Sequence, residues 1–549
     1  MKTTDIVAIQ DQINTMAVVI QISVHKKLKI TVMKYSLLFC MVASIICNSA
    51  HAQPGSLDTR FGEEGIVIKS FGNTATGIPD IINQKDGKIL TSIFVFPDLL
   101  YLYRFNPDGS PDLDFATNGV SITIIKSATD LALQQDGKIL VVGSASTGSG
   151  YQFRRFLPNG QVDSAFGING TKAGTFGGVS TFTNDIEIQD DGKIVSSGTF
   201  SEFGTRSDIF IARFLPDGNV DSSFGDEYGM TRTIDGYGST TIAFQKEGKI
   251  VLAGSDRGEF SNSSRFFLMR FLSNGIIDSS FGEAGTGIVK TDYDKDGDFI
   301  RDIVMQPDDK MVVVGTALVG GLGNKIPYLA IARYLSNGVL DPDFGEGGKV
   351  KLKLAERTEG YGVILQVNGK IVVCGNTSFA NSNYVLARYW SNGSPDSSFG
   401  ENGIVVLDLG SKNEIAYDLI IQPSGRLVVV GLPALLLGFE GDRPGLITKI
   451  RRWIHKNILN FSDVNGTANY YIVEQQKNGG GFLPVARIAA NKSNNYSYNI
   501  SNQKSANTNY RIKAVYADGA VAYSDAINAS VLETDTKVSI SPNPASSII

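Results

Sequence analysis

The chain has 549 residues, of which 42% are hydrophobic and 19% are charged, and its formal net charge is −5. Sixty glycines beside only 17 prolines exclude a disordered or collagen-like chain and favour many short strands joined by tight turns. The length exceeds what one hydrophobic core usually serves, so we expect two or more domains, or one large repeat domain with an appendage.

Residues 1–52 have the pattern of a leader. Four lysines precede an apolar run from Leu37 to Cys47, and Ala50-His51-Ala52 supplies the small residues that a signal peptidase reads. We therefore expect a signal peptide at about residues 33–52, with 1–32 as an over-extended gene start. The run is too short for a permanent membrane-spanning helix. These features predict a secreted protein or one on the outer-membrane surface.

Loss of the leader changes the charge and the cysteine content. It removes five Lys and two Asp, which takes the net charge from −5 to −8 and disfavours nucleic acid and anionic membranes as partners. Cys40 and Cys47 are lost with it, so Cys374 is the only mature cysteine and no internal disulfide can form. Acylation of Cys47 is disfavoured because Ile46 stands where a small residue is required.

A sequence motif of Gln, two variable residues, Gly-Lys and an apolar run recurs seven times along the mature chain. We call this motif the Gln phrase, and the two motifs that follow it the Arg phrase and the Asp phrase. Its glycine position is occupied by Gly87, Gly137, Gly192, Gly248, Asp309, Gly369 and Gly425. The repeat period therefore lies between about 50 and 61 residues.

Two further phrases follow the first in a fixed order. The second is Arg, an aromatic, two residues and Asp/Asn-Gly, and it begins at Arg104, Arg155, Arg213, Arg270, Arg333 and Arg388. At the seventh position the phrase has decayed, and we expect Lys449-Ile450 to stand in its place. The third is Asp, two residues and Phe-Gly, and it begins at Asp58, Asp163, Asp221, Asp278, Asp341 and Asp396, with a near match at Asp112.

These phrases predict about four short strands per repeat. Asn-Gly and Asp-Gly between apolar runs indicate hairpins, and runs such as Ile139–Val142 suit strands covered on both faces. Four strands per repeat, with this period, indicate a β-propeller. The end of one repeat precedes the first Gln phrase. We therefore expect a strand near Ile66-Val67-Ile68 to pair with the blade that contains Leu446 to Ile450 and so close the ring.

The three phrases resemble the delta-60 repeat family over residues 56–450. That resemblance implies a β-propeller of a bacterial secreted protein. We therefore expect an all-β fold: a seven-bladed propeller of four-stranded antiparallel blades over residues 53–455, without catalytic activity.

Residues 456–532 have the alternating pattern of a small β-sandwich, with strands expected at 470–475, 496–500, 510–516 and 520–524. They are similar to a fibronectin type III-like module. The stretch from Leu459 to Tyr470 is too short for the usual first two strands, so we expect an incomplete sandwich. Residues 533–549 resemble the start of a type IX secretion sorting domain that is truncated at Ile549.

The mature chain has few residues of the types that catalysis usually requires. The histidines are His25, His51 and His455, and the first two lie in the leader, so neither a multi-His zinc site nor a His-activated nucleophile inside the ring is expected. The Asp of the third phrase recurs in every blade, which favours a turn cap or a partner for the repeated Arg. The same structural interpretation covers a second set, four residues before the repeat Gln: Asp80, Asp130, Asp185, Asp302 and Asp418.

Two local segments depart from the repeat, one acidic and one basic. Asp292, Asp294, Asp296 and Asp298 alternate around Gly297 like the start of a calcium loop, although Ile303 stands where its last Glu belongs. The alternative is a solvated acidic turn, and we expect no other cofactor. The basic run Arg451–Lys456 is expected to be a linker.

The function predicted is a monomeric, secreted or cell-surface binding or adhesion scaffold for an extracellular glycan or protein. The alternative is a propeller-type polysaccharide hydrolase or lyase that uses carboxylates. The two functions are discriminated by whether carboxylates and aromatics from non-equivalent positions of the repeat converge on one face of the ring.

Overall fold

The computed structural model describes the chain from residue 53 to residue 528 in segments. They are 53–68, 80–95, 98–144, 150–176, 180–201, 208–226, 228–233, 237–256, 264–282, 285–294, 297–320, 325–378, 381–411, 413–441, 450–455, 458–463, 470–477, 483–490, 495–499, 508–515, 521–523 and 527–528. The leader with Cys40 and Cys47, Asp296, and the segment resembling a sorting domain lie outside these ranges.

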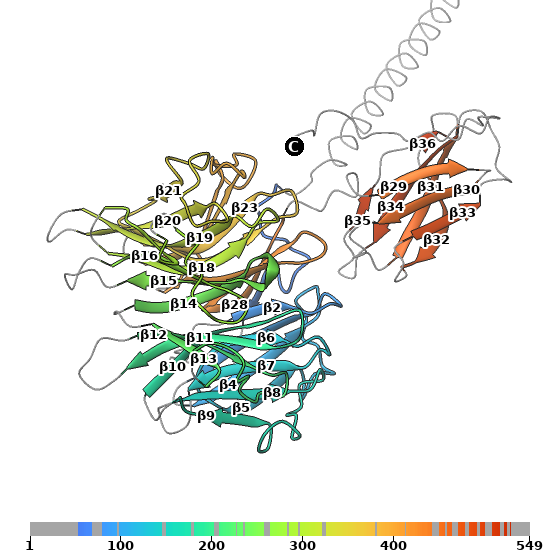
Figure 1. The fold of residues 1–549 in the computed structure, drawn as a ribbon. Helices are drawn as coiled ribbons and strands as arrows, with labels where there is room; N and C mark the ends of the chain where they lie inside the picture. The colour runs from blue at the N-terminus through green and yellow to red at the C-terminus, as the bar shows by residue number, and fades with distance from the viewer. Residues whose placement is uncertain are drawn as a thin grey trace, which may run out of the picture. The chain divides into compact units, whose positions relative to one another are not determined.

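Seven four-stranded antiparallel sheets form the blades of a propeller (Figure 1). Blade 1 contains β2 (Asp80–Asn83), β3 (Ile89–Val95), β4 (Leu99–Phe105) and β5 (Val120–Ile124). Blade 2 contains β6 (Lys126–Leu133), β7 (Ile139–Ser144), β8 (Tyr151–Phe156) and β9 (Thr171–Gly174). Blade 3 contains β10 (Ser180–Ile188), β11 (Ile194–Ser201), β12 (Asp208–Phe214) and β13 (Met230–Thr233). Blades 4 and 5 are β14 (Tyr237–Phe244), β15 (Ile250–Asp256), β16 (Arg265–Phe271), β17 (Ile288–Thr291); and β18 (Asp298–Met305), β19 (Met311–Val319), β20 (Ile326–Tyr334), β21 (Lys349–Leu352). Blades 6 and 7 are β22 (Arg357–Leu365), β23 (Ile371–Ser378), β24 (Ser382–Tyr389), β25 (Ile404–Leu407); and β26 (Ile415–Ile421), β27 (Leu427–Leu432), β28 (Ala434–Phe439), β1 (Ile66–Ile68).

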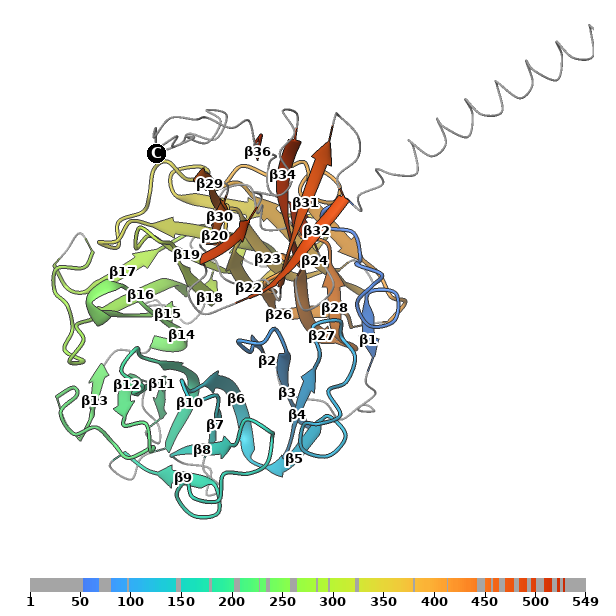
Figure 2. The same cartoon turned by 90° about the vertical axis from the view of Figure 1, so that its right-hand side faces the viewer.

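The seven-bladed fold and the four strands per repeat are confirmed. In each of blades 1 to 6 the first strand ends just before the repeat Gln and the third strand carries the repeated Arg. The glycine of the Gln phrase turns the chain with a left-handed φ, 81° at Gly137, and Asp309, which replaces it in blade 5, adopts φ 64°. The first strands lie innermost around a common axis (Figure 2).

Helical structure is almost absent from the described segments. A 3-10 turn, η2 (Lys246–Gly248), occupies the Gln phrase of blade 4. No helix in the described segments is long and apolar enough to cross a membrane.

The apolar core is divided among the interfaces between blades. Each of the seven clusters of buried apolar side chains draws its members from two neighbouring blades. The runs Ile139–Val142 and Val312–Val314 are fully buried, as predicted for strands covered on both faces. Cys374 is buried in one of these interfaces and is free.

The N-terminal strand closes the ring, as predicted, but its partner differs from the expected one. Ile66 and Val67 of β1 pair with Leu437 and Leu436 of β28. Pairing with the last blade is confirmed, but the assignment of Leu446–Ile450 to that blade was wrong, because its third strand is β28 and Ile450 begins β29. The Arg phrase is absent from β28, so the sequence did not reveal this strand.

The C-terminal strands form two further sheets. The first contains β29 (Ile450–His455), β30 (Ile458–Asp463) and β33 (Asn495–Asn499); the second contains β32 (Leu483–Ala489), β31 (Tyr470–Lys477), β34 (Thr508–Val515) and β35 (Val521–Tyr523), and β36 (Ile527–Asn528) also pairs with β34. The rings of Tyr471 and Tyr496 pack between the sheets at 4.6 Å.

The expected linker at 451–456 corresponds to strand β29, with residues 451–455 inside it. The boundary that we expected at residue 455 therefore lies before residue 450. The first two strands are 450–455 and 458–463, so they need not fit between Leu459 and Tyr470, and the expectation that they would be missing was wrong.

The repeated arginines hold each blade together and attach it to the next. Six of them contact the Asp eight residues later at 2.6–2.9 Å, as the sequence predicted. Arg213 also donates to the carbonyl of Ser273 in the next blade at 2.6 Å, and its guanidinium lies 4.6 Å from the centroid of Phe224. A buried guanidinium is thus paired, hydrogen bonded and stacked.

Blade 7 builds the same contact from a different strand. Gly438 occupies the position of the repeated Arg, because it pairs with Val428 as Arg388 pairs with Val372. Arg426, directly before β27, stands where the other blades have the lysine of the Gln phrase, and it contacts Asp58 at 2.7 Å. Burial alone would raise the pKa of Asp58, but hydrogen bonds from Arg60 and the charge of Arg426 lower it to about 2.

Arg270→Ala is expected to destabilise the propeller by about 3–5 kcal/mol, because it leaves the buried carboxylate of Asp278 without its guanidinium. Lys138→Ala is the matched control, since it removes an ion pair with Asp136 that is exposed and should cost about 0–1 kcal/mol. Denaturant unfolding of both variants measures the two costs. Equal midpoints for Arg270→Ala and the parent would contradict a structural role of the repeated arginines.

Candidate functional site

Five inner strands carry an aspartate directed at the neighbouring blade. These axial aspartates are Asp80, Asp130, Asp185, Asp302 and Asp418, while Thr241 and Gly362 stand there in blades 4 and 6. Asp130 accepts hydrogen bonds from the N–H groups of Leu131 in its own strand at 2.8 Å and of Ile186 in the next blade at 2.7 Å. We expected these residues to cap turns or pair with the repeated Arg; they instead bind backbone N–H groups next to the axis.

The axial carboxyl groups of neighbouring blades act on one another. Asp130 is affected by Asp80 and Asp185, and Asp418 by Asp80 and Asp302. Neighbouring carboxylates disfavour each other's ionisation. Burial, reinforced by the neighbouring carboxylates, raises the pKa of Asp130 and Asp418 well above the usual range. Burial also raises the pKa of Asp302 to about 7, against the opposing effect of the N–H groups of Val363 and Ile303.

A β-bulge precedes the axial position in the inner strands. The ladder shifts register between Ile300 and Asp302, between Gly360 and Gly362, and between Ala416 and Asp418. The residues within these bulges are Arg301, Tyr361 and Tyr417. Bulges turn a side chain out of the regular alternation of a strand and are frequent beside functional sites.

The three bulge residues contact each other across blades 5, 6 and 7. The rings of Tyr361 and Tyr417 meet edge to face at 5.4 Å, and the exposed Arg301 guanidinium lies 5.4 Å from the Tyr361 centroid. The Tyr361 hydroxyl donates to Glu359 at 3.4 Å, and Glu359 pairs with Arg357 at 2.8 Å. We call Arg301, Tyr361 and Tyr417 the bulge cluster.

Burial and the adjacent Glu359 raise the pKa of Tyr361 to about 12, so its hydroxyl remains a donor at neutral pH. Sequence reasoning did not find the bulge cluster. The available signal was the position five residues before the repeat Gln. There the chemistry varies between blades, from Thr129 and Asn184 to Arg301 and two tyrosines, while the next residue is usually Asp.

Glu187 is a further acid on an inner strand. It stands two residues before the repeat Gln of blade 3, where the other described blades carry Ile, Ala or Val. Its side chain retains solvent contact. Even so, burial by the surrounding blades and the charge of Asp185 raise its pKa to about 8.

The residues of the proposed calcium loop are only partly described. Asp298 is buried, and its carboxylate accepts a hydrogen bond from the N–H of Tyr293 at 2.9 Å, while Asp294 accepts one from Gly320 at 3.3 Å. Burial raises the pKa of Asp298 to about 7. Within the described segments no group of three or more His, Cys, Asp or Glu residues is arranged to hold a metal ion. Calcium binding by this loop stays a prediction.

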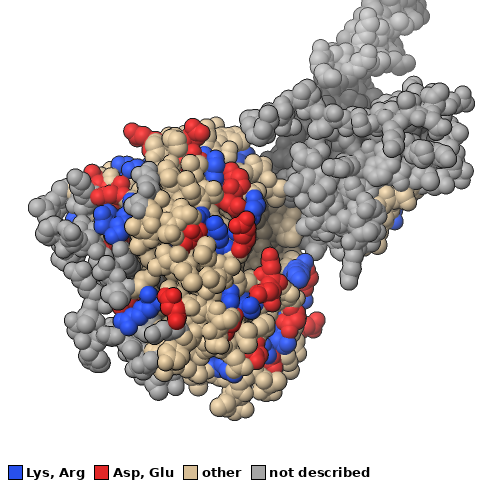
Figure 3. Space-filling view, in the orientation of Figure 1, with Lys and Arg blue, Asp and Glu red and all other residues tan. Residues whose placement is uncertain are grey.

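Charged side chains are mixed on the face of the propeller that Figure 3 shows. Lys and Arg alternate with Asp and Glu over the described part of this face, without an extended basic area.

Comparison with known proteins agrees with the propeller. Five segments match the family described as "Domain of unknown function (DUF5122) beta-propeller": residues 134–166, 189–224, 245–281, 306–344 and 366–399. These segments cover the Gln, Arg and Asp phrases of blades 2 to 6. The chain is a β-propeller.

Solved structures show a more distant likeness. A polysaccharide lyase of family PL25, an ulvan lyase, shares 11% identity over 69% of this chain and 96% of its own, with a TM-score of 0.40. Extracellular domains 1–2 of Drosophila semaphorin 1a share 11% identity over 80% of this chain and 98% of their own, also at 0.40. At these values neither protein's activity transfers to this chain. No curated protein matches the sequence.

The axial aspartates predict a stability that falls from mildly acidic to neutral pH. A carboxyl group whose pKa is raised in the folded state binds more protons there than in the unfolded chain, so its contribution is present below about pH 4 and is lost as pH rises through about 7 for Asp302. Asp58, Asp278 and Asp396 have pKa values of about 2, so their contribution is lost only as pH falls below about 4. The free energy of unfolding should therefore be highest at about pH 4, where both sets of groups contribute.

Asp302→Thr tests this with the residue that blade 4 already uses at Thr241. The variant should be less stable than the parent by more at pH 4.5 than at pH 8, because it lacks the group that takes up a proton on folding. Each such proton changes the slope by about 1.4 kcal/mol per pH unit. Urea unfolding at both pH values measures the difference, and equal costs at the two would refute the assignment of the raised pKa to Asp302.

Proposed function

We propose that the protein is a secreted, non-catalytic binding protein that holds an extracellular glycan at the bulge cluster. The observation that carries this proposal is the convergence of two tyrosines and an exposed arginine from three blades at one position of the repeat. Aromatic rings bind the apolar faces of sugars, and a guanidinium binds their carboxylate or hydroxyl oxygens. The neighbouring positions of the repeat hold the same residue types in most blades. The arginine and tyrosines of the bulge cluster do not follow that repeat, and ligand binding explains them.

The contacts of the axial aspartates favour binding over catalysis. Asp80, Asp130 and Asp302 each accept two backbone N–H groups, one in the same strand and one in the next blade. Carboxylates occupied in this way hold the ring together and are poorly placed to transfer protons to a substrate. In this proposal the bulges present the ligand-binding side chains, while the aspartates fix the bulges.

The C-terminal sheets fit the same proposal. Their strands pair as β29-β30-β33 and β32-β31-β34-β35, an arrangement similar to that of fibronectin type III-like modules. We propose that this module serves as a spacer or contact domain of the exported protein, following the leader that the sequence predicts. Export itself is tested by fractionating cells that express the full chain.

Tyr361→Ala is expected to weaken glycan binding about tenfold, because it removes the central ring of the bulge cluster. A glycan array with the full chain identifies the best ligand, and titration of that ligand by calorimetry measures the loss. Trp390→Ala is the matched control, because Trp390 is a half-exposed aromatic in the turn after β24, stacked on Lys370. Unchanged affinity of the folded Tyr361→Ala protein would refute the site, as would a loss in Trp390→Ala alone.

Glu187 favours a second candidate, a polysaccharide hydrolase or lyase. A carboxylic acid that stays protonated at neutral pH can act as a general acid. Incubating the full chain with the polysaccharides bound on the array and measuring new reducing ends or unsaturated products distinguishes the two. Turnover that Glu187→Gln abolishes would replace the binding proposal with this one.

A further inference from the structure

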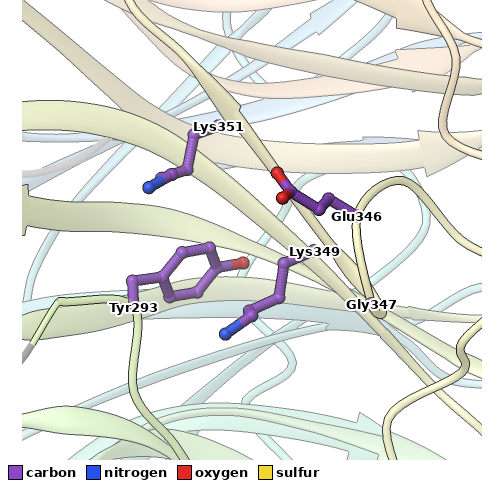
Figure 4. Close-up of a pocket in the computed structure, with 5 residues that line it drawn as sticks. All are labelled: Tyr293, Glu346, Gly347, Lys349 and Lys351. Atoms are coloured by element: carbon purple, nitrogen blue, oxygen red, sulfur yellow. The ribbon is translucent and has the colours of Figure 1, made fainter.

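A pocket separate from the bulge cluster lies where blade 4 meets blade 5. It has a volume of about 540 Å³ and is lined by Tyr293, Glu346, Gly347, Lys349 and Lys351 (Figure 4). Tyr293 follows the outer strand of blade 4, and the other four belong to the turn before β21 and to β21 itself. Volumes of about 300–1,000 Å³ are typical of small-molecule sites.

The hydroxyl of Tyr293 has no partner although it is buried. Its oxygen neither donates nor accepts a hydrogen bond within the described segments. The nearby Tyr334 differs, because its hydroxyl donates to Thr291 at 2.8 Å. A buried hydroxyl without a partner destabilises a protein, so its retention at the wall of a pocket points to a partner supplied from outside.

Packing holds the Tyr293 ring in place. It meets Phe266 edge to face at 5.1 Å, and the Lys349 ammonium lies 5.4 Å from its centroid while donating to the Asp292 carbonyl at 3.1 Å. Burial raises the pKa of Tyr293 well above its usual range, so the hydroxyl is a donor at any physiological pH.

Lys351 lacks the carboxylate partner that the equivalent cations of blades 3 and 4 have. The residues at the same strand position in blades 3 and 4 are Arg232 and Lys290, which pair opposite Phe210 and Phe267 as Lys351 pairs opposite Ala330. Arg232 contacts Asp208 at 2.8 Å and Lys290 contacts Asp256 at 3.4 Å.

In blade 5 the position of Asp256 is taken by Ala317. No ion pair or hydrogen bond of the Lys351 ammonium occurs within the described part of the chain. The pocket therefore contains a positive charge that the neighbouring blades would have neutralised.

We propose that this pocket binds an acidic sugar, with the acid group between the ammonium groups of Lys351 and Lys349 and with the Tyr293 hydroxyl donating to it. Figure 4 shows the two lysines on either side of the Tyr293 ring and Glu346 across the pocket. The Glu346 carboxylate is placed to accept hydrogen bonds from sugar hydroxyls, which an inorganic anion lacks. The site does not depend on the bulge cluster.

The experiment titrates the full chain with glucuronate, glucose 6-sulfate, glucose and inorganic sulfate. We expect saturable binding of one or both acidic sugars, with weaker binding of glucose and of sulfate. The two acidic sugars distinguish a carboxylate from a sulfate ester as the group recognised. Absence of saturable binding of either acidic sugar, or tighter binding of inorganic sulfate, overturns the proposal.

Variants separate this pocket from other sites. Tyr293→Phe removes only the unpartnered hydroxyl, so it should leave the melting temperature unchanged or higher while weakening binding about tenfold, the effect of one charge-assisted hydrogen bond. Lys351→Met should weaken binding at least as much. Lys353→Met is the control, since Lys353 stacks on Tyr328 outside the pocket.

Repeating the titrations in the Tyr361→Ala background removes any binding at the bulge cluster, so failure of the bulge cluster and failure of the pocket are distinguishable. Equal affinities for the parent, Tyr293→Phe and Lys351→Met overturn the assignment.

Discussion

The buried pair between the repeated arginine and the aspartate eight residues later is the contact on which the propeller depends. In blades 1 to 5 the same guanidinium also donates to a backbone carbonyl of the next blade, as Arg270 does to Ser336 at 2.6 Å. A blade therefore cannot satisfy its own arginine without its neighbour. This requirement joins seven small sheets, whose apolar cores are individually thin, into one cooperative ring.

Ring closure meets the same requirement with different residues. In blade 7 the aspartate is Asp58, more than 360 residues away in sequence from the guanidinium of Arg426 that it binds. Loss of the strand arginine to Gly438 is compensated by replacement of a lysine with arginine on the adjacent strand. Phe61 fills the space that this change leaves, since a Cβ on Gly438 would lie 2.5 Å from its ring. The contact has been kept while its residues changed.

The inner strands combine a repeated structural residue with a variable one next to it. The axial aspartates bind the N–H group that follows the axial position, both in their own strand and in the next blade, which fixes the chain directly after the bulge residue. That residue is then free to vary: it is threonine or asparagine in some blades and arginine or tyrosine in blades 5 to 7. Similarly, the pocket beside Tyr293 arises where Ala317 stands at the position that Asp256 occupies in blade 4. Both candidate sites are departures from the repeat.

The sequence by itself determined the propeller, its seven blades, the strands on which the phrases lie and the pairing of Arg213 with Asp221, because these follow from local turns and from a period that recurs. It also predicted closure by Ile66–Ile68. Only the tertiary structure decided that β28 is the closing partner, that Ile450–His455 starts the C-terminal sheets, and that Arg301, Tyr361 and Tyr417 meet. Those contacts join residues from different blades or from an altered repeat, and their distances are set by how the blades pack rather than by any local pattern.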